Sequence, residues 1–225
     1  MFSDALMKLW NKGIIQLGIW ETIYMTLLST AIAYIIGLPI GVLLSITDKE
    51  GIHPIPWLNK ALGIVVNIFR SIPFVILMVA ILPAAKAVVG TSIGNRAMIF
   101  TLVVAAAPYI ARMVESSIKE VDKGVIEAAQ AMGSPSFKII TKVLIPEAKP
   151  ALIVGAVIST VTVLGYSAMA GTIAGGGLGK IAIINGYQRS ESDIIWVCVV
   201  LTIIIVEIIQ EVGMRIALKT DKRIR

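Results

Sequence analysis

The glycine-rich stretch AGGGLGKIA, residues 174–182, is the part of the chain closest to a nucleotide-binding loop. A phosphate-cradling loop needs glycine, four residues, then glycine, lysine and serine or threonine, because its backbone amides surround the phosphates. Counting back from Gly179 and Lys180, the first position holds Ala174 and the last holds Ile181. The pattern fails at both ends, so we expect these glycines to form a flexible turn near the outer mouth of a pathway.

Side chains suited to nucleophilic or metal chemistry are equally sparse. The one histidine, His53, stands in a short loop with two prolines, and a single histidine without partners is a poor ligand or base. The one cysteine, Cys198, lies inside an apolar run, where we expect an inert lipid-facing or packing role. The sequence therefore predicts that this chain is not an enzyme and holds no metal or cofactor of its own.

Charged residues inside apolar runs form a second group of candidates. Arg70 stands in NIFRSIPF, while Glu207, Glu211 and Arg215 follow one another at intervals of four in a later run. A charge in hydrocarbon is costly, so such groups face a protein interior or water. We expect Arg70 to meet a carboxylate, backbone carbonyls or water, in a packing or a gating role. We expect Glu211 to pair with Arg215 along one helix face.

The composition indicates where these residues must lie. Of the 225 residues, 57% are hydrophobic and only 15% are charged, which no ordinary water-soluble domain of this length requires. A spanning helix needs roughly 20 mostly apolar residues. The sequence thus predicts an all-α integral membrane protein, a single transmembrane domain over residues 1–225. Its five predicted spans lie near residues 18–46, 60–84, 96–118, 149–170 and 193–216.

Five helices leave little room for a pathway inside one chain, which favours a two-fold dimer. Pro39, Pro73 and Pro108 are expected to kink their helices so that parts of them can rock. The start of the chain has no compact apolar core followed by a small-residue cleavage site, so we expect the first span to be retained.

Lysine and arginine residues are unevenly shared between the predicted loops. If the polar segment 120–146 is cytoplasmic, thirteen of them lie on its side and six lie opposite, with Arg70 inside a span. The positive-inside rule then predicts an N terminus outside and a C terminus in the cytoplasm. The net charge of +6 consequently needs no nucleic acid to explain it. The six outside residues are Lys8, Lys12, Lys86, Arg96, Lys180 and Arg189.

The segment KEVDKGVIEAAQAMGSPSFKIITKVLIPEA, residues 119–148, is too polar to cross a membrane. Val121, Val125, Ala128 and Met132 recur at helical spacing and predict one apolar stripe. A helix of about twelve residues here is too short to span the hydrocarbon. We therefore expect it to lie parallel to the membrane on the cytoplasmic side.

Turn signals divide this segment. Gly133 is well placed as the left-handed residue that closes the first helix. Ser134 followed by Pro135 is a helix-start signal, with a cap and a first-turn proline. Pro146 marks the point where the second helix must end or kink. The sequence predicts a helix, a sharp turn and a second helix.

Glu127, Ala128 and Ala129, followed by Gly133 and by VLIP at residues 143–146, resemble the EAA loop of ATP-binding-cassette importer permeases. That family usually ends the motif with isoleucine, any residue, leucine and proline, so Val143 and Ile145 are conservative departures. The resemblance implies a coupling helix seated in a cleft of a separate ATPase subunit. The coupling residues that it implies are Glu127, Ala128, Ala129, Met132, Gly133 and Pro146.

Stretches along nearly the whole chain, among them VVNIFRSIPFVILMVAILP, AAAPYIARMVESSI and LGYSAMAGTIAGGGLG, resemble the methionine importer permease subfamily. The resemblance implies five spans, a homodimer in the bacterial inner membrane and an extracytoplasmic methionine-binding protein. It also implies two partner ATPase subunits that bind the ATP and Mg. Methionine is a zwitterion with a soft apolar tail, so Tyr166, Ser167 and Met169 are candidates, with Arg70, for the pathway or its gate.

Other functions remain open from the sequence. The substrate of such an importer is methionine, another amino acid or a methionine-containing peptide. A secondary transporter driven by an ion gradient is disfavoured, because the two cleanest apolar runs, residues 22–47 and 150–179, hold no carboxylate for a proton or sodium relay. A membrane scaffold without transport activity would leave the short exposed helix at EAAQAMG, residues 127–133, unexplained.

Overall fold

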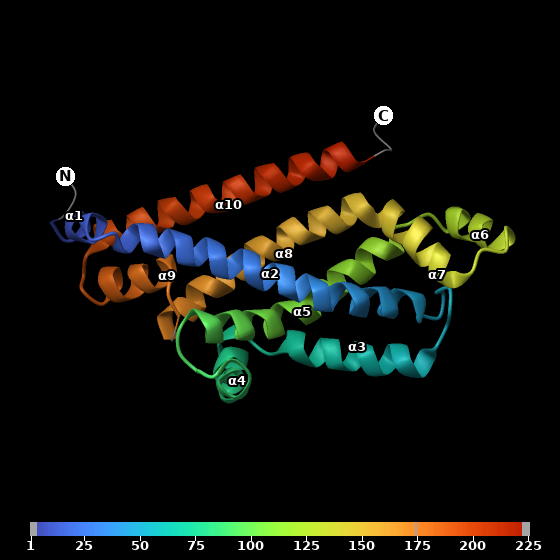
Figure 1. Cartoon of the computed structure of the whole chain (residues 1–225), viewed down its shortest axis with the longest axis horizontal. Coiled ribbons are helices and arrows are strands. Elements are labelled where there is room, and N and C mark those ends of the chain that lie inside the picture. The colour runs from blue at the N-terminus through green and yellow to red at the C-terminus, as the bar shows by residue number, and fades with distance from the viewer. Residues whose placement is uncertain (1–3, 174, 222–225) are drawn as a thin grey trace. The chain divides into compact units, whose positions relative to one another are not determined.

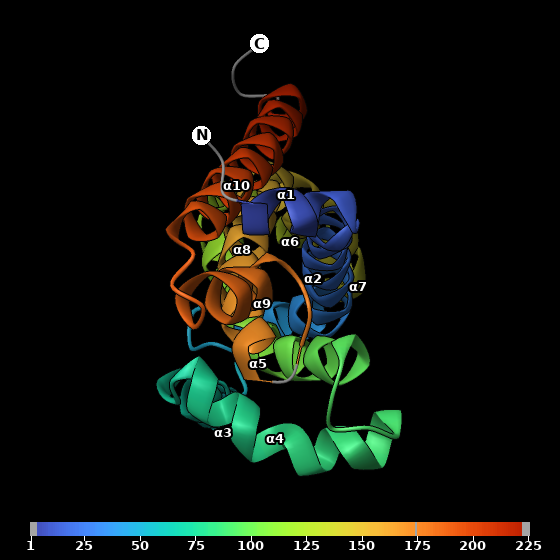
Figure 2. The ribbon, with the colours of Figure 1, turned by 90° about the vertical axis from the view of Figure 1, so that its left-hand side faces the viewer.

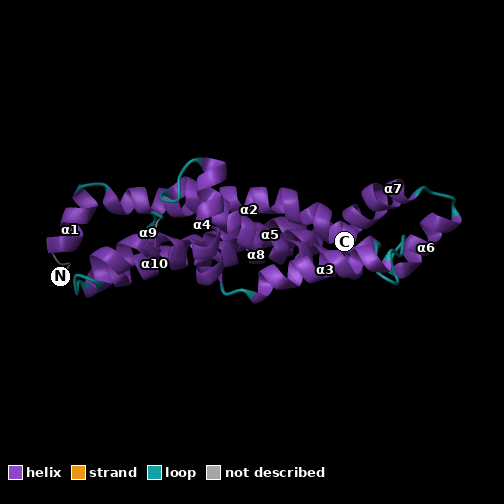
Figure 3. Ribbon diagram, turned by 90° about the horizontal axis from the view of Figure 1, so that it is seen from below, coloured by secondary structure: helices purple, strands orange, loops and turns teal. Residues whose placement is uncertain are grey.

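The computed structural model describes residues 4–173 and 175–221, and this part of the chain is helical without any strand (Figure 3). Two π-helical turns, η1 (Ile140–Leu144) and η2 (Ile181–Tyr187), continue α7 and α9. The α-helices are α1 (Asp4–Asn11), α2 (Ile14–Ile46), α3 (Pro56–Ser71), α4 (Phe74–Val89), α5 (Asn95–Lys119), α6 (Lys123–Ala131), α7 (Ser136–Ile139), α8 (Ile145–Ile173), α9 (Leu178–Lys180) and α10 (Ser192–Thr220).

Within the described ranges, four helices are long and apolar enough to cross a membrane: α2, α5, the continuous helix Ser136–Ile173, and α10. Helices α3 and α4 meet the same criterion only as a pair, so the count becomes five if that pair is one span. The predicted all-helical membrane architecture is confirmed.

The segment predicted as one helix near residues 60–84 is broken in the structure. α3 ends at Ser71 and α4 begins at Phe74, with Pro73 at its N-cap. Proline disfavours the helical conformation of the residue before it, here Ile72, which explains the break. Pro39 and Pro108, by contrast, lie inside the continuous helices α2 and α5.

The chain divides into two compact units, and unit 1 comprises Met1–Ile32, Ile72–Ala106 and Thr160–Gln210. In this unit α1, α9 and the start of α10 lie close to the start of α2 (Figures 1 and 2). Cys198 is buried in their apolar core, as expected of a packing residue. The buried residues of this core are Leu6, Ile15, Leu164, Leu178, Ile181, Ile194, Cys198 and Ile205.

Unit 2 comprises Ala33–Ser71, Ala107–Ser159 and Glu211–Arg225. Here α2 and α5 approach closely, because a Cβ atom on Gly41 would lie only 2.5 Å from the Ala111 carbonyl oxygen. Small residues at such crossings allow helix backbones to pack tightly. Leu44, Val66 and Ala111 form the buried apolar cluster of this region.

Candidate functional site

The polar segment of unit 2 folds as a helical hairpin of α6 and α7, which Figure 1 shows side by side. α6 begins after Asp122, whose carboxylate accepts a hydrogen bond of 2.7 Å from the Gly124 amide. It has nine residues, shorter than the predicted twelve, because Val121 lies ahead of the cap. Below, "the hairpin" means residues 122–139.

Gly133 closes α6 as the sequence predicted. Its φ is +71°, in the left-handed region. The Gly133 amide donates to the Gln130 carbonyl at 2.9 Å, and the Ser134 amide donates to the Ala129 carbonyl at 3.2 Å. These two bonds form the Schellman motif that satisfies the last carbonyls of a helix.

The second arm departs from the prediction at its start. α7 begins at Ser136 with Pro135 at the N-cap, one residue later than the predicted cap. The helix does not end at Pro146 but continues to Ile173. The π-helical turn η1 lies just before the proline, where the Ile145 amide donates to the Ile140 carbonyl. A local π-turn is one way for a helix to accommodate a residue that lacks an amide proton.

Most predicted coupling residues lie on the surface. Glu127, Ala128, Gly133 and Pro146 are exposed, and Met132 is 77% exposed. Ala129 is the exception, since it is buried and anchors α6. The hairpin thus presents its motif to the outside.

The predicted apolar stripe is also largely exposed. Val121 is buried, but Val125 and Met132 are exposed large apolar residues. Phe137 on the second arm, which the sequence reasoning missed, is 75% exposed. Large exposed apolar side chains in a soluble segment mark an interaction surface or membrane contact.

The α2–α3 loop, residues 47–55, is tied to both arms of the hairpin. Glu50 forms an ion pair with Lys123 in the first turn of α6. The His53 ring nitrogen Nε2 lies 2.5 Å from Ser136 Oγ at the start of α7. This contact was not anticipated from the sequence; it gives His53 one hydroxyl neighbour, without a cluster of metal-ligating groups in the described part of the chain. Because only Ala129 of α6 is buried, α6 is held mainly at its ends.

A second set of ion pairs joins the α2–α3 loop to the end of α5. Lys119 Nζ lies 2.5 Å from Asp48 Oδ2 and 2.9 Å from Glu115 Oε1. The other Glu115 oxygen lies 2.6 Å from Arg112 Nη1, and Arg112 Nη2 donates to Asn67 Oδ1 of α3 at 3.0 Å. Glu115 is buried, and its two carboxylate oxygens are paired with Lys119 and Arg112, which compensates the cost of burying its charge.

These pairs shift the ionisation of the loop groups. The hydrogen bond from Lys119 lowers the pKa of Asp48, and the hydrogen bond from Lys123 lowers the pKa of Glu50. The same contact with Glu50 raises the pKa of Lys123. All three groups are therefore charged at neutral pH.

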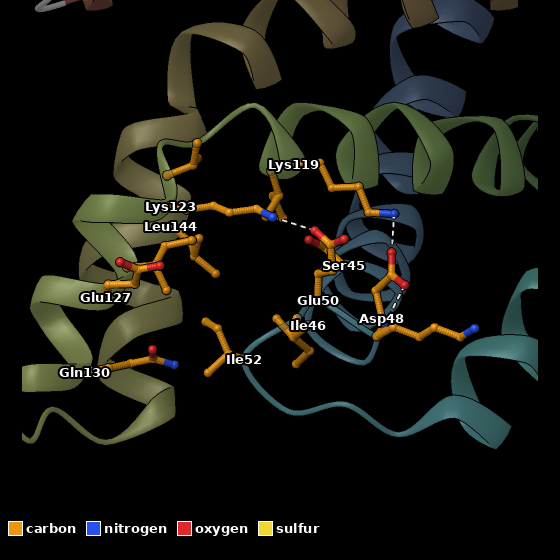
Figure 4. A pocket seen from close by; sticks show the side chains of 15 residues that line it. Ser45, Ile46, Asp48, Glu50, Ile52, Lys119, Lys123, Glu127, Gln130 and Leu144 are labelled. Carbon is orange, nitrogen blue, oxygen red and sulfur yellow. Dashed lines mark hydrogen bonds and ion pairs between the residues drawn. The ribbon is translucent and has the colours of Figure 1, made fainter.

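A cavity of about 540 Å³ lies between the α2–α3 loop and α6 (Figure 4). Its charged rim includes Asp48, Glu50, Lys119, Lys123 and Glu127. Ile46, Ile52, Ile118, Ile126 and Leu144 provide its apolar surface. This cavity lies between α6 and the α2–α3 loop, and the ion pair between Lys123, in the first turn of α6, and Glu50 of the loop connects the two.

The four predicted pathway or gate residues lie in different surroundings. Arg70 is exposed at the end of α3, and no partner of its guanidinium is found in the described part of the chain. In unit 1, Tyr166 stacks on Phe74 with ring centroids 4.5 Å apart, and Met169 is 48% exposed. Ser167 is buried and donates to the Leu164 carbonyl at 2.7 Å. Their role in a pathway remains a prediction.

On the last helix, the predicted pair is confirmed, because Arg215 Nε donates to Glu211 Oε1 at 2.6 Å. Glu207 is exposed. Sequence reasoning missed the anchors Glu50, Lys123 and Ser136. The acidic loop TDKEG and the basic start of α6 carry opposite charges, which was the signal available.

The family profile described as "Binding-protein-dependent transport system inner membrane component" matches residues 37–224. The chain belongs to this family. As a member of it, the chain is an inner membrane transport component with several apolar helices.

Related proteins match over nearly the full length of this inner membrane component. A Vibrio cholerae protein described as a probable D-methionine transport system permease protein MetI is 46% identical over 213 residues, 95% of each chain. The Bacillus subtilis methionine import system permease protein MetP is 45% identical over 218 residues, covering 97% of this chain and 96% of that protein.

A solved structure is also similar. A chain from inward-facing conformations of the MetNI methionine ABC transporter has a TM-score of 0.92 and 43% identity, over 98% of this chain and 100% of that chain. A chain of an amino acid ABC transporter, with a TM-score of 0.78 and 18% identity, shares the fold.

Proposed function

We propose that this chain is the permease subunit of an ATP-binding-cassette importer that takes up methionine. The observation that carries the proposal is the exposed hairpin with its EAA motif, closed by Gly133 and anchored at both ends. The similarity to methionine permeases over more than nine tenths of the chain supports the substrate class.

The proposed assembly has two copies of the chain, two ATPase subunits and an extracytoplasmic methionine-binding protein. In this assembly the ATPase subunits bind the ATP and Mg, and the permease provides the pathway. The hairpin is the proposed docking element for the ATPase, with Met132 and Phe137 offering apolar contact and Glu127 a charge.

The proposed orientation puts unit 2 on the cytoplasmic side. All six lysine and arginine residues predicted to lie outside fall within unit 1, while the other fourteen fall within the ranges of unit 2. This division supports an N terminus outside and a C terminus inside. We also propose that the present conformation is inward-facing, as described for the similar MetNI chain.

The proposed mechanism is a shift between inward-open and outward-open dimers, driven when ATP closes the partner subunits. Movement of the hairpin would reach α2 through Glu50 and Lys123, and α8 through the continuous helix that starts at Ser136. Lys119 connects the same loop to α5. The hairpin is thus joined to three of the candidate spans.

Cysteine cross-linking tests this proposal. Met132→Cys places a thiol on the exposed hairpin, and Val88→Cys, 68% exposed in α4, is the matched control in unit 1. Both variants carry Cys198→Ser, which removes the chain's natural thiol. We expect the copurified ATPase to cross-link to position 132 and not to position 88. Cross-linking at position 88 alone would refute the assignment of the hairpin.

A further inference from the structure

The chain reversal after α8 is held by side chains from two other helices of unit 1. Three successive backbone amides point at three different acceptors. Gly176 donates to Asn95 Oδ1 at 3.1 Å, and Gly177 donates to Glu21 Oε2 at 2.7 Å. Leu178 donates to Thr22 Oγ1 at 2.9 Å. Glu21 and Thr22 belong to α2, and Asn95 begins α5.

These acceptors are themselves oriented. Asn95 Nδ2 donates to Glu21 Oε1 at 2.9 Å, so both carboxylate oxygens are engaged. The Thr22 hydroxyl donates to the Gly18 carbonyl at 2.8 Å, which leaves its lone pairs for the Leu178 amide. Hydrogen bonds to a charged acceptor are stronger than those between neutral groups.

The glycines permit this close approach. Gly177 has φ of +90°, which L side chains rarely adopt. A Cβ on Gly176 would collide with Glu21 Oε2, and one on Gly177 would lie 2.7 Å from Thr22 Oγ1. The glycines were predicted to form a flexible turn. In the described residues 175–178 they instead form a loop fixed by a network of four hydrogen bonds.

The helices joined here are the helices to which the hairpin is coupled in the proposed mechanism. The loop follows α8, its acceptors lie on α2 and α5, and each of these three helices is continuous into unit 2. In the proposed mechanism, a rocking motion driven from the hairpin changes the packing of these three helices against one another. The network around Glu21 opposes such a change as long as it is intact.

We propose that Glu21, oriented by Asn95, is a positioning residue for transport, a latch that holds the glycine loop to α2 and α5 and stabilises the inward-facing state. This inference rests on the proposed function. Breaking the latch removes these hydrogen bonds from the inward-facing state alone, so the equilibrium shifts toward the outward-facing state. If the network around Glu21 served only the fold, breaking it would lower the stability of the permease without changing the response of the complex to the binding protein.

The donors and acceptors allow a specific rescue. In Glu21→Gln, the new side-chain amide faces the Asn95 amide, so two donors meet. In Asn95→Asp, two carboxylates face each other. In the double variant, the amide introduced at position 21 donates to the carboxylate introduced at position 95, and both side chains still accept from the backbone amides of the loop. The charge moves from one side chain to the other while all four hydrogen bonds are restored.

The first measurement is hydrogen exchange of the Gly176 and Gly177 amides, whose acceptors are Asn95 and Glu21, in the purified permease. Each single variant should exchange about ten- to a hundredfold faster than the parent, the effect of losing a charge-assisted hydrogen bond. The double variant should return close to the parent rate. Glu207→Gln, an exposed carboxylate in the same unit, is the control and should change nothing. Unchanged exchange in Glu21→Gln, or no recovery in the double variant, would overturn the latch.

The second measurement is ATPase activity of the reconstituted complex, with and without the binding protein. The single variants should raise the activity without binding protein and lower the stimulation ratio, and the double variant should restore both. Normal stimulation ratios in the single variants would overturn the role in transport. A parent complex that takes up no methionine refutes the proposed function, whereas the exchange rates still decide whether the latch exists.

Discussion

Gly133 offers a graded test of the hairpin, because its cost of substitution comes from the backbone alone. Its φ is +71°, and no heavy atom lies within 4 Å of a Cβ built there. A left-handed L residue costs roughly 1–2 kcal/mol, which lowers the equilibrium constant for forming the native turn about five- to thirtyfold. Asparagine tolerates this region better, and a β-branched residue is an outlier in it.

We therefore expect Gly133→Asn to keep most ATP-dependent uptake, Gly133→Ala to lose a large part of it and Gly133→Val to abolish it. The assay is uptake of labelled methionine into liposomes that hold the variant, the ATPase and the binding protein. The amount of each variant inserted in the membrane should be equal, because the site lies outside the candidate spans. Normal uptake by Gly133→Val at equal insertion would refute the coupling role of this turn.

Three further predictions follow from the contacts of unit 2. Glu115→Ala leaves Arg112 and Lys119 without their shared carboxylate and should lower the free energy of unfolding by roughly 1–3 kcal/mol. Glu211→Ala, which breaks an exposed ion pair, should change that free energy by less than about 1 kcal/mol. Thermal unfolding of the two variants measures the difference. Gly41→Ala places a Cβ within 2.5 Å of the Ala111 carbonyl oxygen and should lower the free energy of unfolding by about 1–3 kcal/mol. Gly165→Ala, whose Cβ would have no atom within 4 Å, is the control and should be tolerated. Equal melting temperatures of the two variants would contradict the packing account. The folded-state pKa values of Asp48 and Glu50 are lowered, so their ion pairs stabilise the loop and the hairpin at any pH above the ordinary carboxyl pKa values of 3.8 and 4.5. This stabilisation is lost as the pH falls through the lowered pKa values. A spin label at Met132→Cys should therefore become more mobile below about pH 4 and keep the same mobility from pH 5 to 8.

Local chemistry made part of the structure predictable. The end of α6 at Gly133 depends on a residue that reaches the left-handed region without strain, and such a signal is readable from neighbouring residues. The Glu211–Arg215 pair is likewise set by helical spacing. Most of the spans were likewise predictable, because a long apolar run without charge is a property of contiguous residues.

Contacts between distant segments could not be predicted. The sequence reasoning did not single out Glu21, because only the fold brings Gly177, 156 residues later, to its carboxylate. His53 looked isolated because its partner Ser136 stands 83 residues away. Pro146 was expected to end or kink a helix, yet a π-helical turn before it lets the helix continue, and that outcome depends on context rather than on residue type.

The most direct test of the account is uptake of labelled methionine into liposomes that contain the permease, its copurified ATPase and the binding protein, with all ion gradients collapsed. The account predicts uptake that requires ATP on the side of the hairpin and disappears when the ATPase is left out. Methionine uptake that follows an imposed ion gradient and needs no ATP would contradict it.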